Sequence, residues 1–142
     1  MIMRTVRFTV PGPPKGKARA RTVRTRGGQT FSYTPEGTVL YENLIKISFS
    51  QTGERPFRAE EYLRVTIMAY YPVPKSTSKK KATEMVAGYI RPAKKPDIDN
   101  VIKSILDALN GVAYHDDTQV IAVTAEKRYG AEARVEVEIS EI

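Results

Sequence analysis

The sequence predicts an α+β fold, with helices packed on one face of a small mixed β-sheet. Two observations lead to this prediction, and a third bears on the number of domains. Apolar residues alternate with polar ones near the start, the middle and the end of the chain, as in half-buried strands. Between these stretches, apolar residues recur with helical spacing. No repeat and no change of composition divides the chain, so residues 1–142 are expected to form a single domain.

The first third of the chain predicts a strand, a polar loop and a helix. Arg4–Val10 alternates apolar and polar side chains, which is typical of a strand with one buried face. Residues 15–30 are polar and are interpreted as a loop. The helix is expected to begin with Thr34 as N-cap and Pro35 at the first helical position, and to end before Gly53.

The middle of the chain predicts a second strand and two helices. The strand is expected at Tyr62–Tyr71, where apolar and polar side chains again alternate. Residues 75–87 are rich in lysine and predict a short helix starting near Ser78. Val101–Leu109 has the spacing of an amphipathic helix of about three turns, and the Asn-Gly pair at Asn110 favours its end.

Two strands are predicted to close the chain. Val120–Val123 begins one of them, and Ala133–Ile139 alternates apolar and charged residues in the other. The sequence Tyr129-Gly130-Ala131 has the character of a turn between them. These two strands are therefore expected to pair with each other in an antiparallel hairpin.

The charge of the chain points to a polyanionic partner. The net charge is +7, with a pI of about 9.7. Residues 1–35 hold eight basic residues and no acidic one. Such a segment suits nucleic acid, because neutralising phosphates releases counterions. The candidate contacts are Lys15, Lys17, Arg19, Arg21, Arg24 and Arg26, followed by a second cluster at Lys79, Lys80 and Lys81. The alternative for both clusters is a solvated surface.

Composition also excludes several classes of site. The chain has no cysteine and a single histidine, His115, which excludes disulfides, thiolate metal sites and a multi-histidine zinc site within one chain. It contains no apolar run long enough to span a membrane, and its first residues lack the apolar stretch of a signal peptide. A cytoplasmic protein without membrane contact is therefore expected.

Two acidic pairs are the candidate catalytic feature. Asp97 and Asp99 precede the third predicted helix, and Asp116 and Asp117 follow it. If residues 97–99 are extended, their two carboxylates point to the same side. The simpler alternative is that one of these aspartates only caps the helix. Clustered carboxylates without cysteine or several histidines favour Mg²⁺ or Mn²⁺. The spacing does not establish that the two pairs meet in space.

Lys103 lies four residues after Asp99, on the same face of the predicted helix. There it is either a surface partner of that carboxylate or a group that holds the scissile phosphate of a nucleic acid. Asp107, one turn further, is expected to pair with Lys103 or to support the site. His115 adjoins the second acidic pair and is interpreted as incidental.

The acidic residues stand within three motifs, namely Lys95-Pro96-Asp97-Ile98-Asp99-Asn100 followed by Lys103, Leu106-Asp107-Ala108-Leu109-Asn110-Gly111, and Asp116-Asp117-Thr118-Gln119-Val120. In combination they resemble the RusA family of Holliday-junction resolvases, or crossover junction endodeoxyribonucleases. Three further segments resemble the longer members from phages, prophages and Gram-positive bacteria: Lys17-Ala18-Arg19-Ala20-Arg21, Tyr33-Thr34-Pro35 and Pro74-Lys75-Ser76. Ala20 departs from the pattern, which has a proline there, and this bears on the conformation of the loop.

The resemblance implies specific roles for these residues. Asp97, Asp99 and Asp117 match the essential metal-binding aspartates of the family, and Asp116 matches the neighbouring acidic position. Lys103 matches a lysine required for cleavage. The resemblance further implies a homodimer that uses Mg²⁺, or Mn²⁺ in its place, and acts on branched DNA.

The function expected from these roles is the resolution of four-way junctions by paired symmetric nicks in DNA recombination and repair. The basic clusters would then contact the DNA backbone. Two alternatives remain open at this point: a nuclease of broader branch specificity, acting on flaps or forks, and a nucleic-acid-binding module without catalysis.

Overall fold

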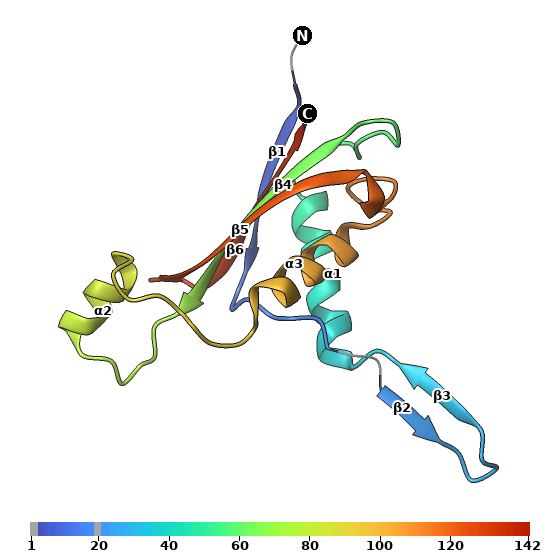
Figure 1. Cartoon of the computed structure of the whole chain (residues 1–142), viewed down its shortest axis with the longest axis horizontal. Helices are drawn as coiled ribbons and strands as arrows, with labels where there is room; N and C mark the ends of the chain where they lie inside the picture. Colours follow the sequence, from blue (N-terminus) through green and yellow to red (C-terminus); the bar gives the residue numbers. More distant parts are fainter. Residues whose placement is uncertain (1–2, 19–20) are drawn as a thin grey trace.

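The structure is a computed structural model that describes residues 3–18 and 21–142. Its centre is a four-stranded mixed sheet of β1 (Thr5–Pro11), β6 (Arg134–Glu141), β4 (Leu63–Pro72) and β5 (Val120–Gly130), in that spatial order (Figure 1). The pairs β1–β6 and β6–β4 are antiparallel, and the pair β4–β5 is parallel. The prediction of an α+β fold with a small mixed sheet is confirmed.

The predicted hairpin between the last two strands is wrong, because β4 lies between β5 and β6. Residue Val137 of β6 faces Phe8 of β1 on one side and Ile67 of β4 on the other. The chain therefore crosses the end of β4 when it passes from β5 to β6. Gly130 permits this crossing: a Cβ atom there would lie 3.0 Å from the Cβ atom of Tyr70. The turn near Gly130 was predicted correctly, but β5 and β6 on either side of it both pair with β4 and not with each other.

Two helices cover one face of the sheet. Helix α1 (Glu36–Ser50) and helix α3 (Ile98–Leu109) pack against each other on the same side of the strands (Figure 1). Alternate residues of β4 point toward them and are buried, as the period of two predicts. The core consists mainly of apolar side chains from β1, β4, β6 and the two helices, among them Val10, Ile45, Phe49, Val65, Ile105, Leu109 and Ile139.

The boundaries of the helices differ slightly from the prediction. Helix α1 has Pro35 rather than Thr34 as N-cap residue, and it ends at Ser50, before Gly53 as predicted. Helix α2 (Lys79–Val86) begins after Ser78, whose hydroxyl accepts a hydrogen bond from the Lys81 amide, so this predicted start is confirmed. Helix α2 contacts β5 and lies at the end of the sheet away from α1 and α3 (Figure 1). No helix in the described part of the chain is long and apolar enough to cross a membrane.

The segment interpreted as a polar loop contains a β-hairpin instead. Its strands, β2 (Arg21–Arg24) and β3 (Thr30–Tyr33), pair antiparallel and project away from the sheet and helices (Figure 1). Gly28 closes the turn with φ +80° and donates its amide proton to the Thr25 carbonyl oxygen at 3.0 Å. The sequence signal for these strands is weak, because β3 alternates polar and aromatic side chains over only four residues and neither strand has a buried face.

Candidate active site

The first acidic pair lies at the N-terminus of α3. Asp97 is the N-cap residue, and Asp99 lies in the first helical turn. The helix begins three residues earlier than Val101, so residues 97–99 do not meet the condition of an extended segment under which both carboxylates would point to one side. The Asp97 carboxylate makes no capping hydrogen bond to any described residue, so the capping alternative does not explain it. Both side chains are exposed, and the positive end of the helix dipole stabilises their negative charge.

The loop that leads into Asp97 is fixed to the sheet. The Tyr71 hydroxyl donates to the Pro96 carbonyl oxygen at 2.5 Å, and the Lys127 ammonium group donates to the Lys94 carbonyl oxygen at 2.6 Å. Burial raises the pKa of Tyr71 to about 12, and the negative charge of Asp97 adds to this effect. Tyr71 therefore positions the backbone beside the candidate carboxylates. Sequence reasoning placed it only as the last residue of a strand.

The second acidic pair lies at a single 3₁₀ turn, η1 (Asp117–Gln119). Asp116 is its N-cap residue and accepts a hydrogen bond from the Thr118 amide at 3.0 Å, which lowers the pKa of this carboxyl. The pKa of Asp117 is raised by burial, then by its hydrogen bond to Asp116 and that residue's charge, with a further contribution from Asp107. Asp116 thus has a structural role as a cap, whereas Asp117 lacks one.

Gln119 holds this turn in place. Its side-chain oxygen accepts from the amides of His115 at 2.9 Å and Asp116 at 3.1 Å. Its side-chain nitrogen donates to the carbonyl oxygens of Arg58 at 2.8 Å and Glu61 at 2.9 Å. An amide side chain has two donors and two acceptor positions, so its capacity is fully used. Sequence reasoning missed this role, although the spacing Asp116-x-x-Gln119 is that of a capping box and could have signalled the contact with the Asp116 amide.

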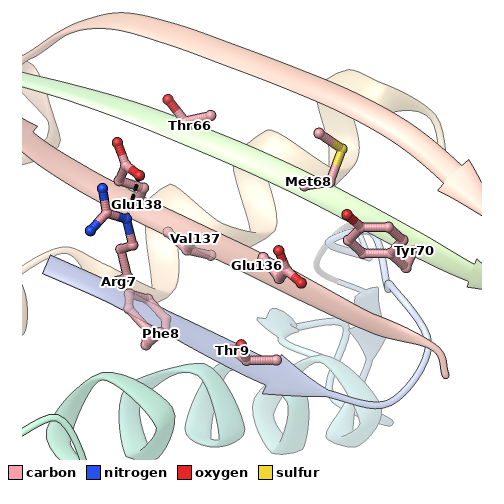
Figure 2. A pocket seen from close by; sticks show the side chains of 9 residues that line it. All are labelled: Arg7, Phe8, Thr9, Thr66, Met68, Tyr70, Glu136, Val137 and Glu138. Atoms are coloured by element: carbon pink, nitrogen blue, oxygen red, sulfur yellow. Dashed lines mark hydrogen bonds and ion pairs between the residues drawn. The ribbon is translucent and has the colours of Figure 1, made fainter. Parts of the chain in front are cut away.

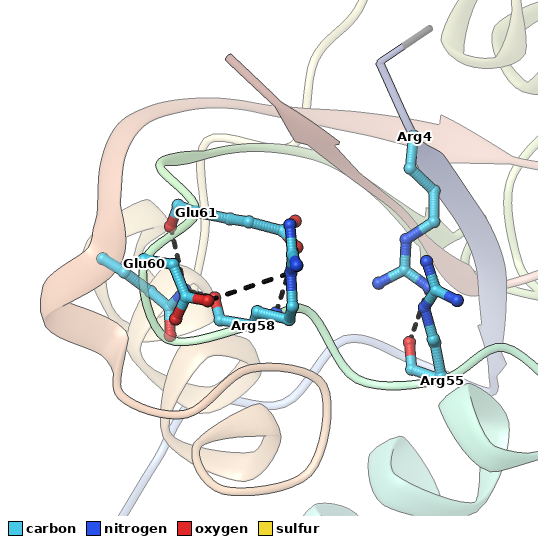
Figure 3. A network of polar contacts seen from close by, with 6 residues as sticks. Arg4, Arg55, Arg58, Glu60 and Glu61 are labelled. Atoms are coloured by element: carbon cyan, nitrogen blue, oxygen red, sulfur yellow. Dashed lines mark hydrogen bonds and ion pairs between the residues drawn. The ribbon is translucent and has the colours of Figure 1, made fainter.

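The segment that Gln119 contacts, from Arg58 to Glu61, contains an ion pair of its own. The Arg58 guanidinium donates to the Glu61 carboxylate at 3.1 Å, on the chain that precedes β4 (Figure 3). Near it, the Arg4 guanidinium donates to the Arg55 carbonyl oxygen at 2.8 Å (Figure 3). The support of the second acidic pair therefore extends to residues about sixty positions away in the sequence.

Replacing Gln119 with leucine is expected to lower the free energy of unfolding by about 3 kcal/mol, because four partly buried backbone groups lose their partner. Urea denaturation measures this loss. Gln51→Leu is the matched control, since Gln51 is exposed and the same substitution there is expected to change stability by less than about 0.5 kcal/mol. Equal stability of the two variants would show that the Gln119 contacts do not hold the turn.

Lys17 is bound by two carboxylates of the protein. Its ammonium nitrogen lies 2.8 Å from the Asp107 carboxylate on α3 and 3.6 Å from the Glu42 carboxylate on α1. The hydrogen bond with Asp107 is the main cause that raises the pKa of Lys17. Asp107 therefore pairs with Lys17, not with Lys103. DNA contact by Lys17 stays a prediction. In the structure, the positive charge of Lys17 is already neutralised by carboxylates of the same chain.

Gly16, next to Lys17, lies directly against the start of α3. A Cβ atom at position 16 would be 3.0 Å from the Cβ atom of Asn100 and 3.2 Å from that of Pro96. On the other side, the Ala18 amide donates to the Thr38 hydroxyl of α1 at 3.3 Å. Residues 15–18 thus lie between the N-terminal ends of both helices, beside the first acidic pair.

The remaining predicted site residues lie on exposed surfaces. Lys103 is exposed on α3 and forms no ion pair with a residue in the ranges 3–18 or 21–142, so the pairing with Asp99 is not observed. Arg19 lies outside the described residues, as does Ala20. The other predicted DNA contacts are exposed. Lys15 lies in the loop after β1, Arg21, Arg24 and Arg26 lie on the β2–β3 hairpin, and Lys79, Lys80 and Lys81 lie in the first turn of α2. Their contact with DNA stays a prediction.

The two acidic pairs do not form a preassembled metal site. Within residues 3–18 and 21–142, no three histidine, cysteine, aspartate or glutamate side chains lie close enough together to hold a metal ion. Asp107 nevertheless acts on the pKa of Asp117, which places α3 and η1 within electrostatic range of each other. The chemistry of the donors fits a hard divalent cation, since all are carboxylates. The convergence of the pairs stays a prediction.

A concave surface on the opposite face of the sheet contains none of the predicted site residues. It is lined by side chains of β1, β4 and β6, among them Thr66, Met68 and Tyr70 (Figure 2). An ion pair between Arg7 and Glu138, 2.8 Å apart, lies across it. Glu138 and Glu136 on this surface pair with Arg7 and Arg134, whereas no arginine of the described residues pairs with Asp97 or Asp99.

Comparison with known proteins covers nearly the whole chain. A family model described as "Endodeoxyribonuclease RusA" matches residues 11–140, from the end of β1 to β6. A protein from Bacillus subtilis (strain 168), named "Uncharacterized protein YqaN", is 35% identical over 142 residues, which is 99% of each chain. Both matches include the two acidic pairs, Lys103 and the β2–β3 hairpin.

Proposed function

Because the chain belongs to the RusA family of endodeoxyribonucleases, we propose that it is a Mg²⁺-dependent enzyme that resolves four-way DNA junctions by paired symmetric nicks in recombination and repair. The observation that supports this proposal best is the state of Asp97. It occupies a helix N-cap, yet its carboxylate makes no capping hydrogen bond to a described residue. That carboxylate is exposed next to Asp99 and is available to bind a cation.

Asp97, Asp99 and Asp117 are the proposed metal ligands, and Asp116 is a further ligand or only the cap of η1. A divalent cation bound there would supply an ionised water and neutralise charge on the departing 3′ oxygen. Hydrogen bonds hold the backbone beside each acidic pair. Tyr71 holds the backbone before Asp97, and Gln119 holds the backbone before Asp117. Mn²⁺ is expected to substitute for Mg²⁺, since both prefer oxygen ligands.

Lys103 is the proposed partner of the scissile phosphate. It lies four residues after Asp99 on an exposed helical face, and no described carboxylate neutralises it. An ammonium group in that position stabilises the extra negative charge that develops on the phosphate during hydrolysis. We assign Lys17 a different role, which is to anchor residues 15–18 to α3 through Asp107.

A homodimer is part of the proposal. A four-way junction has two strands of like polarity to cut, and a two-fold dimer would present one active site to each. The net charge of +7 favours association with such a polyanion, and the exposed arginines and lysines would bind its backbone. Sedimentation of the protein with and without junction DNA tests this part, and a monomer in both samples would contradict it.

Asp117→Asn is expected to leave the metal-free protein at least as stable as the wild type. The raised pKa of Asp117 means that the folded state binds this proton more tightly than the unfolded chain does. The free energy of unfolding therefore falls as pH rises through the raised pKa of Asp117. Asparagine does not ionise, so the variant does not lose this stability at pH 7. Thermal unfolding in EDTA measures the comparison.

Adding Mg²⁺ to the same samples completes the test. A cation that binds only the folded state raises the melting temperature of the wild type. The Asp117→Asn variant is expected to respond less, because it lacks one proposed ligand. An equal response of both proteins would remove Asp117 from the proposed site, and a variant several degrees less stable in EDTA would contradict the raised pKa of Asp117.

Cleavage of a mobile four-way junction and of a flap substrate, each with Mg²⁺ or EDTA, tests the proposed activity. The expected result is symmetric nicking of the junction that requires Mg²⁺ and a much slower reaction on the flap. Equal rates on both substrates would indicate a nuclease of broader branch specificity. Binding without cleavage under any metal condition would indicate a nucleic-acid-binding module.

A further inference from the structure

The β2–β3 hairpin exposes an aromatic surface. Val23 faces Phe31 across the two strands, and Arg21 faces Tyr33, so these four side chains share one side of the hairpin. Phe31 is 51% exposed, Tyr33 42% and Val23 37%. The rings of Phe31 and Tyr33 lie 6.4 Å apart at an interplanar angle of 42°. Large apolar side chains that gather on an exposed surface mark an interaction site more often than isolated ones do.

No other described part of the chain covers this surface. Every residue of β2 and β3 is exposed, and the hairpin projects away from the sheet and helices (Figure 1). The opposite side of the hairpin is polar: the hydroxyls of Thr22 and Ser32 lie 3.3 Å apart there. A two-stranded hairpin that packs on nothing is only marginally stable in water. The aromatic side is therefore the one expected to gain from an occupant.

The charge around the aromatic surface identifies the occupant as nucleic acid. Arg21, Arg24 and Arg26 lie on the hairpin or in its turn, and the first 35 residues of the chain contain no acidic residue. Two such hairpins from separate copies would repel each other, whereas a phosphate backbone is attracted. Aromatic rings stack on the faces of unpaired bases, whatever the base. Bases inside an intact duplex do not offer those faces.

The hairpin leaves the body of the protein beside the candidate active site. Residues 15–18 precede it, and within them Gly16 lies against Asn100 at the start of α3. Lys17 is bound to Asp107 of the same helix at 2.8 Å. The helix that contacts residues 15–18 thus has Asp97 as its N-cap residue and Asp99 in its first turn.

We propose that Phe31 and Tyr33 form a stacking surface for an unpaired nucleobase, with Arg21, on the same side of the hairpin, at an adjacent phosphate, and with Arg24 and Arg26 adding positive charge to the hairpin. In a four-way junction we expect this base to lie at the branch point, and that part of the proposal rests on the proposed function. The stacking of single-stranded DNA on the hairpin is independent of the proposed function and can be measured separately.

Fluorescence anisotropy with three labelled probes tests the proposal: a four-way junction, a duplex of equal length and an oligo(dT) strand, all in EDTA. A variant carrying Phe31→Ala and Tyr33→Ala is expected to bind the junction and oligo(dT) about tenfold more weakly. Duplex binding is expected to change by less than about twofold. The matched control carries Thr22→Ala and Ser32→Ala, on the other side of the hairpin, and should bind all three probes like the wild type.

Two further substitutions separate stacking from other causes. Phe31→Trp should keep the affinity for oligo(dT), and Phe31→Leu should lose it, because leucine is apolar without being aromatic. Equal losses on duplex and oligo(dT), or full affinity with leucine, would overturn the proposal. So would a fall in the sedimenting mass of the free protein on Phe31→Ala, since the hairpin would then be a contact between two copies.

The result also separates this inference from the proposed function. If the wild type does not cleave junctions but its oligo(dT) affinity still depends on Phe31, the stacking surface stands and the junction activity fails. If the doubly substituted variant binds oligo(dT) like the wild type while the wild type resolves junctions, the stacking surface fails and the activity stands.

Discussion

Asp99→Asn is expected to reduce the rate of junction cleavage on the order of a thousandfold in saturating Mg²⁺. Asp99 is exposed in the first turn of α3, next to an N-cap carboxylate that makes no capping hydrogen bond to a described residue. Asparagine keeps the size of the side chain but removes the charge that a hard cation requires. Junction affinity in EDTA is expected to stay within a few fold of the wild type, because no DNA contact is removed. Single-turnover cleavage measures the rate.

Asp116→Asn is the control that makes this result specific. It removes the same charge from the second acidic pair, but the asparagine oxygen can still accept the hydrogen bond from the Thr118 amide. The expected loss of rate is tenfold or less. Cleavage at the wild-type rate by Asp99→Asn, or equal losses for both variants, would show that the first acidic pair is not the centre of the site.

Lys103→Met is expected to slow cleavage on the order of a hundredfold, with Mg²⁺ binding unchanged. The ammonium group lies on the face of α3 that also carries Asp99, and none of the described residues forms an ion pair with it. Methionine keeps the apolar length of the side chain and removes only the charge. Single-turnover rates at saturating Mg²⁺ and saturating junction DNA measure the effect.

Lys46→Met serves as the matched control for Lys103→Met. Lys46 is a partly exposed lysine on α1, and its loss lowers the net charge by the same amount. A similar rate for the two variants would mean that Lys103 acts only through the overall charge of the protein. A hundredfold difference would place the group at the reacting phosphate.

The fold could be predicted from the sequence where a pattern reports burial directly. The strand at Tyr62–Tyr71 and the helix ending at Leu109 have one apolar face each, and both were found nearly where expected. The pairing of the last two strands could not be predicted in this way. Which strand lies beside β6 depends on competition from β4, which is far away in the sequence. A local turn signal at Gly130 carries no information about that competition.

The candidate site was predictable as a set of residues but not as an arrangement. Two aspartates of the same appearance in the sequence differ in the structure: Asp116 caps η1, and Asp97 occupies an N-cap without capping. The supporting residues were missed altogether. Tyr71 and Gln119 donate hydrogen bonds to backbone oxygens on distant segments, and spacing in the sequence does not report these long-range contacts.

Lys17 was predicted as a DNA contact, but its charge is paired within the protein. Its position in a basic segment predicted DNA contact, because the sequence shows the charge of a side chain but not its partner. In the structure, Asp107 and Glu42 provide that partner from two helices. The arginines of the β2–β3 hairpin have the same charge in the sequence but lie on an exposed element.

A crystal structure of the protein with Mg²⁺ tests the central claim most directly, because it shows whether one cation joins the two acidic pairs. The predicted result is a cation bound by carboxylate oxygens of Asp97, Asp99 and Asp117, at about 2.0–2.1 Å. Among the described residues no three such groups lie close enough together to hold a cation, so a site made of these three ligands requires movement of side chains or of η1 toward α3. A cation held elsewhere, or Asp117 still apart from Asp97 and Asp99 in a crystal that contains Mg²⁺, would contradict the proposed site.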